Sequence, residues 1–126
     1  MLNKIFKSGL IVAFALVMIA TLTSCQKEKE TIARIVVKNS NGAVVPNAKV
    51  TLFPDSIISS GGEWPDPSLT KGPKETDING QVEFEYDLEA ILNIKATKVD
   101  GNSIYNGSDI IRLLKGKTVT EVVEIN

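Results

Sequence analysis

The sequence predicts an all-β sandwich built from six or seven short strands. Several stretches alternate apolar and polar residues with the period of two that is typical of a half-buried strand. Turn-forming residues separate these stretches at intervals of about ten residues, which is the spacing of an all-β sandwich. No stretch shows the period of a helix. These observations indicate one domain of modest size with a single core.

Residues 1–24 have the layout of a secretory signal peptide. Lys4 and Lys7 precede an apolar stretch that runs from Leu10 to Ala20. A transmembrane helix needs about 20 apolar residues, and Thr21 interrupts this stretch before that length is reached. We therefore expect the segment to target the chain and then to be removed.

Cys25 is the candidate site of lipidation. The residues "LTSC" at 22–25 resemble the lipobox of bacterial lipoproteins, in which the signal is cut before a cysteine that becomes acylated. Cys25 is the only cysteine in the chain, which favours a lipid over a disulfide. The alternative is an ordinary signal peptide whose cleavage site contains a cysteine. The resemblance implies a signal peptide at 1–24 and a lipidated cysteine, followed by a tether, at 25–31. The strand pattern assigns 32–126 to the sandwich.

Gln26 predicts the outer membrane as the location. Gln26 is the second residue of the chain that would remain after cleavage before Cys25. In lipoproteins of Gram-negative bacteria, an aspartate at that position is the pattern of retention in the inner membrane, and this chain has glutamine instead. The charged residues that follow, up to Glu30, predict a solvated tether.

The first two strands are predicted at 31–38 and 48–53. In each, apolar residues alternate with polar or charged ones, so that one face is expected in the core. Asn41-Gly42 suits a turn between them. Pro46 has no N–H to donate and is expected in the connection or at a strand edge.

Residues 54–74 break this alternation. The stretch holds four of the five prolines and the only tryptophan, Trp64. A loop of this length is uncommon in a compact domain. We therefore predict a short strand at 56–59 and a loop from 61 to 74.

Four further strands are predicted at 81–86, 90–99, 103–114 and 117–125. The residues "DGN" at 100–102 supply a turn before the third of them. The rows expected to face the core are Ala33, Ile35 and Val37; Ala48, Val50 and Leu52; Val82, Phe84 and Tyr86; and Leu92, Ile94 and Ala96.

The stretch "TDINGQVEFEY" at 76–86 concentrates oxygen-bearing side chains, so it is either a calcium loop or a turn. An EF-hand loop counted from Asp77 requires glycine at its sixth position, where Val82 stands, and Gly80 comes two residues too early. The alternation also places Glu83 and Glu85 on the solvent face of a strand. We therefore predict a turn at 77–80 and no metal.

Three stretches resemble the carboxypeptidase regulatory-like domain, a transthyretin-like (prealbumin-like) sandwich. They are "ARIVVKNSNGAVVPNAKVTLF", "KETDINGQVEFEYDLEAILNIKA" and "IRLLKGKTVTEVVEIN". Thr76, Asp77, Gly80 and Phe84 occupy the places of the family pattern Thr-Asp-x-x-Gly-x-x-x-Phe. The resemblance implies a seven-stranded Ig-like or transthyretin-like β-sandwich, with 54–74 as a long insertion. It implies no activity, because the shared positions are turn and core positions.

A related family, the collagen-adhesin B-type domain, joins a first-strand lysine to a last-strand asparagine by an isopeptide bond. Lys38 and Asn126 lie in the corresponding places. A buried acid must move protons between the amine and the amide. The inward row expected for the strand at 90–99 carries no acid, so we expect no such bond.

The composition argues against an enzyme. The chain has no histidine, and its only cysteine is expected to carry lipid. This excludes Ser–His and Cys–His nucleophile pairs and histidine metal sites. We expect no catalytic residue and no cofactor. The chain has 14 basic and 15 acidic residues without a basic cluster, so we also expect no nucleic acid partner.

Candidate contact residues are Trp64, Tyr105 and Asn106. Trp64 stands in "GGEWPDPS", and an aromatic side chain on a loop contributes a large apolar area at little entropic cost. The alternative is that Trp64 folds back over an open end of the sandwich. Asp55-Ser56-Ile57 resembles the acceptor of some periplasmic O-glycosylation systems, which makes Ser56 a candidate glycosylation site.

A lipid anchor on a domain without catalytic groups predicts an outer-membrane lipoprotein. We expect a non-enzymatic interaction or accessory module of an envelope assembly, whose partners are the membrane and an envelope protein. The alternative is a carbohydrate-binding module that uses Trp64, with Tyr105 and Asn106 as further contacts to a glycan.

Overall fold

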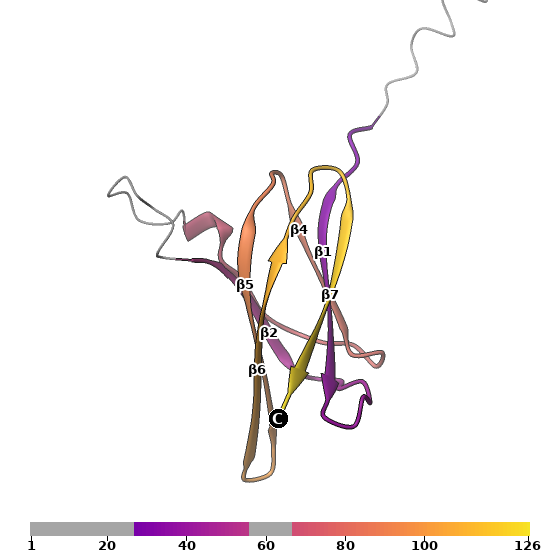
Figure 1. Ribbon diagram of the computed structural model, residues 1–126, viewed down its shortest axis with the longest axis vertical. Helices are drawn as coiled ribbons and strands as arrows, with labels where there is room; N and C mark the ends of the chain where they lie inside the picture. The colour runs from indigo at the N-terminus through magenta and orange to yellow at the C-terminus, as the bar shows by residue number, and fades with distance from the viewer. Residues whose placement is uncertain (1–26, 56–66) are drawn as a thin grey trace, which may run out of the picture.

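The computed structural model describes residues 27–55 and 67–126, and these fold into a sandwich of two sheets (Figure 1). The strands are β1 (Thr31–Asn39), β2 (Lys49–Pro54), β3 (Lys71–Glu75), β4 (Gln81–Tyr86), β5 (Ile91–Asp100), β6 (Ser103–Arg112) and β7 (Thr118–Ile125). The prediction of an all-β, seven-stranded sandwich is confirmed.

The two sheets differ in size and in the direction of one strand pair. The three-stranded sheet has the order β4-β1-β7, and the four-stranded sheet has the order β3-β2-β5-β6. β1 and β7 run parallel, with Ile35 opposite Glu121. Every other neighbouring pair is antiparallel. The first and last strands of the domain therefore lie side by side in the smaller sheet.

The core lies between the sheets and is formed by the alternation visible in the sequence. All four predicted inward rows are buried, with Phe84 the most exposed member at 5%. Near the C-terminus the core gains Ile111, Leu113, Val123 and Ile125. Burial of one such large apolar side chain contributes about 1.5–3 kcal/mol, so this shared core is the main source of stability.

The prediction of a loop from 61 to 74 was wrong at its C-terminal end. β3 begins at Lys71 and pairs with β2, and a short 3-10 helix, η1 (Pro67–Leu69), precedes it. The sequence "KGPKE" has no apolar alternation because four of its five residues are exposed at the edge of the sheet. Pro73 is tolerated there because an edge strand can spare one N–H donor. The strand predicted at 56–59 lies outside the described residues.

The first strand begins at Thr31, the last residue assigned to the tether. Thr31 is only 2% exposed. Its Oγ1 accepts a hydrogen bond from the N–H of Gly116 at 2.9 Å, and the N–H of Ile32 donates to the carbonyl of Lys117. These bonds attach the start of β1 to the loop between β6 and β7.

The two seams between the sheets are closed in different ways. On one side Lys74 Nζ donates to the carbonyl of Glu83 at 2.9 Å, and Lys71 Nζ donates to the carbonyl of Glu85. On the other side Asn106 and Asn126 exchange two backbone hydrogen bonds of 3.2 Å each. Within residues 27–55 and 67–126, no helix is long and apolar enough to cross a membrane.

Candidate functional site

The turn predicted at 77–80 is present. Gly80 has φ +69°, and its N–H donates to the carbonyl of Asp77 at 2.9 Å. Asp77 Oδ1 accepts hydrogen bonds from the N–H groups of Asn79 at 2.9 Å and Gln81 at 3.0 Å. This carboxylate therefore stabilises its own turn, as Asx side chains do.

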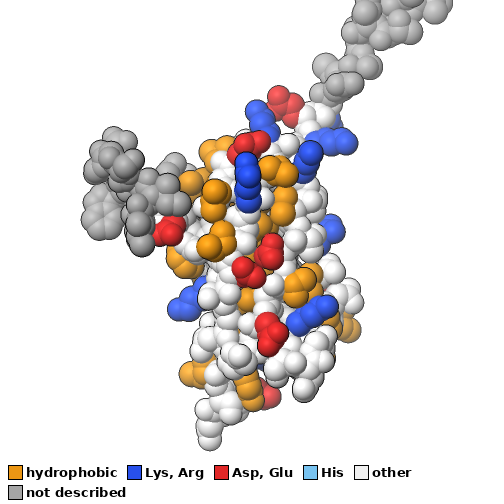
Figure 2. All heavy atoms as spheres, in the orientation of Figure 1, with side chains coloured by type: hydrophobic (Ala, Val, Ile, Leu, Met, Phe, Trp, Pro, Cys, Tyr) orange, Lys and Arg blue, Asp and Glu red, His pale blue; other side chains and the backbone are white. Residues whose placement is uncertain are grey.

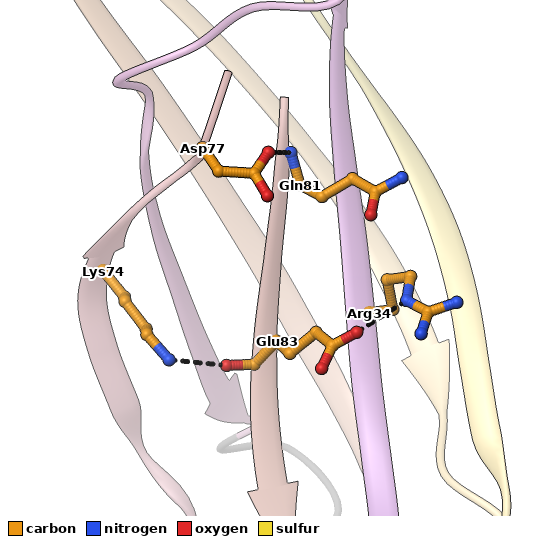
Figure 3. A network of polar contacts seen from close by, with 5 residues as sticks. All are labelled: Arg34, Lys74, Asp77, Gln81 and Glu83. Atoms are coloured by element: carbon orange, nitrogen blue, oxygen red, sulfur yellow. Dashed lines mark hydrogen bonds and ion pairs between the residues drawn. The ribbon is translucent and has the colours of Figure 1, made fainter. Parts of the chain in front are cut away.

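The acidic side chains of this stretch do not converge. Figure 3 shows Asp77 directed to Gln81, whereas Glu83 lies farther along β4 and is directed to Arg34 on β1. Glu83 Oε1 is 2.8 Å from Arg34 Nε, in an exposed ion pair. Among the described residues no group of three or more acidic, cysteine or histidine side chains could hold a metal ion. The arrangement has the geometry of a turn followed by a paired strand.

A hollow of about 500 Å³ lies at the end of the sandwich formed by the β1–β2 connection and the β5–β6 turn. Its lining combines one aromatic ring with several amide, hydroxyl and charged side chains. These residues are Asn39, Ser40, Asn41, Val45, Lys98, Asp100, Tyr105, Ile125 and Asn126. The hollow lies at the opposite end from the tether, which leaves the sandwich at the start of β1 (Figure 1).

Local hydrogen bonds fix the walls of this hollow. Asn39 Oδ1 accepts from the N–H groups of Asn41 and Ala43, both at 3.0 Å, and thereby shapes the β1–β2 connection. Lys98 Nζ donates to the carbonyl of Pro46 at 3.1 Å, which joins β5 to that connection. Tyr105, which is 41% exposed, presents its ring to a pre-formed surface.

Polar groups remain available in the hollow. Within the described ranges, the side chains of Asn41, Tyr105 and Asn126 have no hydrogen-bond partner. Each amide offers both a donor and an acceptor, and the phenol offers one of each. Together with the face of the tyrosine ring, this set suits a ligand that carries hydroxyl groups next to an apolar face.

Tyr105 and Asn106 do not form one site. They are consecutive residues of β6, so their side chains point to opposite faces of the sheet. Asn106 lies in a shallow depression of about 810 Å³ on the outer face, with Asn93 and Phe53 in the same lining. Its Oδ1 accepts a hydrogen bond from Thr97 Oγ1 at 3.1 Å. Tyr105 and Asn106 therefore lie on different faces of the sheet, and their role as contacts stays a prediction.

Lys38 and Asn126 are not connected through a buried acid. Among the described residues, the buried polar side chains are Thr31 and Thr76, and no buried acid accompanies them. The inward row of β5 is Leu92, Ile94 and Ala96, all fully buried, as the sequence predicted. The proton carrier that an isopeptide bond requires is therefore missing from the described core.

Tyr86 is the one described residue with a clearly shifted pKa. Burial raises the pKa of Tyr86 from 10.0 to about 12. Its hydroxyl donates to the carbonyl of Leu69 at 3.0 Å, and Lys71 Nζ lies 4.6 Å from the ring centre. These contacts attach η1 and β3 to β4, so the phenol has a structural role.

The other predicted site residues lie outside the described ranges. These are Cys25, Ser56 and Trp64. The residues that sequence reasoning missed are the partners of Tyr105 in the hollow, Asn39, Asn41 and Asn126. They come from distant parts of the chain, so no local pattern could have grouped them with Tyr105.

The geometry defines a small all-β sandwich domain with one end attached to a tether and a polar hollow at the other. No protein-family model matches the chain. No curated protein matches it either.

Proposed function

We propose that this chain is an outer-membrane lipoprotein whose sandwich acts as a non-enzymatic interaction module of a cell-envelope assembly. The observation that carries the proposal is Cys25 in a lipobox-like sequence, followed directly by a short tether that leads into β1. Several acyl chains contribute about 0.8 kcal/mol per buried methylene, which is enough to hold such a domain at a bilayer.

Replacement of the cysteine tests the anchor. Cys25→Ser removes the sulfur that would carry the lipid, so the variant should lose lipid-dependent processing and leave the membrane fraction. Labelling with a radioactive fatty acid and fractionation of cells would measure both effects. Ser24→Ala is a matched control and should remain lipidated. A Cys25→Ser protein that is still cut before residue 25 and still bound to membranes would refute the anchor.

Crosslinking in intact cells tests the partner. We expect mass spectrometry to recover one envelope protein repeatedly, linked to lysines of the sandwich, because a tethered domain meets neighbours at high local concentration. The Cys25→Ser variant provides the control, since it should lose those crosslinks. Recovery of no recurring protein would contradict the proposal of an interaction module.

Glycan binding is a second candidate, favoured by the hollow around Tyr105. An aromatic face next to amides that donate and accept suits the apolar face and the hydroxyl groups of a sugar. In calorimetric titrations with a panel of glycans, Tyr105→Ala should weaken binding several-fold, whereas Tyr105→Phe should retain the ring and most of the affinity. Equal binding by wild type and Tyr105→Ala, or binding to no glycan, would exclude this function.

A further inference from the structure

Residues 27–30 of the tether lie beside two other segments, 87–91 and 113–117, at the end of the sandwich where β1 begins. We call these three segments the tether end. The N–H of Leu113 donates to the carbonyl of Ala90 at 2.8 Å, so the second and third segments are joined. The N–H of Lys115 also donates to Glu89 Oε1 at 3.4 Å. The first segment reaches the third, because a Cβ at Gly116 would lie 3.5 Å from the carbonyl of Lys29.

The tether end exposes large apolar side chains. Leu88 is 45% exposed, Ile91 is 53% exposed and Leu114 is 36% exposed. Figure 2 shows apolar side chains gathered towards this end of the visible face, with basic and acidic side chains beside them. Apolar side chains are also exposed at the opposite end, where Ile104 is 62% exposed, but Leu88, Ile91 and Leu114 lie beside the tether, where a bilayer that holds Cys25 would cover them.

The charges of the tether end are balanced. Its lysines are Lys27, Lys29, Lys115 and Lys117, and its acidic residues are Glu28, Glu30, Asp87 and Glu89. A surface with both signs interspersed is neither attracted to an anionic bilayer nor repelled by a neutral one. It matches headgroups that carry both a phosphate and an ammonium group.

The tether is too short to hold the domain far from its anchor. Lys29, which lies beside Gly116, follows Cys25 by four residues, and four extended residues span about 14 Å at most. The polar headgroup layer of one leaflet is itself about 5–8 Å thick. An acylated Cys25 would therefore keep the tether end close to the headgroups.

We propose that the tether end seats directly on a zwitterionic phospholipid surface, with Leu88, Ile91 and Leu114 at the level of the headgroups. This inference rests on the proposed lipid anchor. β5 has 10 residues and runs from the tether end to the opposite end, a distance of about 33 Å. The hollow around Tyr105 therefore faces away from the bilayer, where a soluble ligand or partner can reach it.

Lipid-borne quenchers measure this orientation. Full-length lipidated protein is placed in vesicles of phosphatidylcholine and phosphatidylethanolamine that contain a lipid with a quencher in its headgroup region. A thiol-specific dye is attached to Lys115→Cys or, as the matched control, to Asn102→Cys in the β5–β6 turn. Cys25 is blocked by its thioether and does not react. We expect several-fold stronger quenching at position 115 than at position 102.

A second comparison tests the apolar contacts. Leu114→Asp should reduce the quenching at position 115 several-fold while the protein still floats with the vesicles. Ile104→Asp introduces the same charge at an exposed apolar position of the opposite end and should leave the quenching unchanged.

Three outcomes would overturn the inference. Equal quenching at positions 115 and 102, in protein that floats with the vesicles, would show that the domain is anchored but that its tether end does not contact the bilayer. Quenching at position 115 that appears only with anionic lipids would refute the zwitterionic surface. Failure of the protein to float at all would refute the anchor itself and this inference with it.

Discussion

Gly80 and Asp77 stabilise the turn before β4 in different ways. Gly80 has φ +69°, and a Cβ there would lie 2.9 Å from both the carbonyl oxygen of Val37 and the Cβ of Val44. Asp77 accepts two backbone hydrogen bonds but is exposed, so water can replace it. Gly80→Val should therefore destabilise the fold by on the order of 1–3 kcal/mol, and Asp77→Ala by about 1 kcal/mol or less.

Thermal or urea unfolding of both variants, with and without millimolar calcium, measures this difference. We expect calcium to leave the wild-type unfolding midpoint unchanged. A midpoint that rises with calcium in the wild type, but not in Asp77→Ala, would replace the turn interpretation with a metal site.

Tyr86 predicts a loss of stability at alkaline pH. Burial raises the pKa of Tyr86 from 10.0 to about 12, so the folded protein retains the phenolic proton at pH values where the unfolded chain has lost it. The resulting contribution is complete below pH 10 and declines as the pH rises towards 12. The free energy of unfolding should fall more steeply in wild type than in Tyr86→Phe over this interval. Parallel curves, measured by denaturant titration at each pH, would contradict the prediction.

At the scale of the element, β3 and β4 are edge strands, and side chains of β3 cover the open edge of β4. The carbonyls of Glu83 and Glu85 point away from β1 and would be free to pair with another chain, but the ammonium groups of Lys74 and Lys71 cover them. Lysine at an edge is a common defence against edge-to-edge association. Lys71→Thr/Lys74→Thr should therefore promote self-association, which light scattering and sedimentation velocity would detect.

Lys49→Thr/Lys95→Thr is the matched control for this double variant. It removes the same charge from exposed positions of β2 and β5 in the same sheet. The control should associate no more than wild type. Equal association of both double variants would mean that net charge, and not protection of the β4 edge, opposes self-association.

At the scale of the whole molecule, Gly107 allows β6 and β7 to meet across the seam between the two sheets. A Cβ at this position would collide with the backbone carbonyl of Glu124. Gly107→Ala should separate the strands, expose the hydrogen bonds between Asn106 and Asn126 to solvent, and destabilise the fold by about 1–3 kcal/mol. Hydrogen exchange at the N–H groups of Asn106 and Asn126, together with denaturant unfolding, measures both effects. Ser108→Ala is the control on the same strand and should be more stable than Gly107→Ala. Equal free energies of unfolding for the two variants would refute the role of the glycine.

The sequence alone determined the strands that alternate and the direction of their side chains. Successive side chains of a strand point to opposite faces, so the inward rows of β1, β2, β4 and β5 follow from local spacing. The turn at 77–80 was equally predictable, because it depends on residues close in sequence. Asp77 accepts a hydrogen bond from the N–H of Gln81, and Gly80 adopts the positive φ that the turn requires.

Only the tertiary structure decided the features that depend on contacts between distant segments. β3 is a strand because its backbone pairs with β2, although its exposed residues carry no alternating pattern. The hollow unites Asn39, Tyr105 and Asn126 because the end of β1, the start of β6 and residue 126 lie at the same end of the sandwich. In the same way, the tether end collects apolar side chains from two loops beside the start of β1. Such groupings are set by how the sheets pack, and packing distances are not encoded in the spacing of residues along the chain.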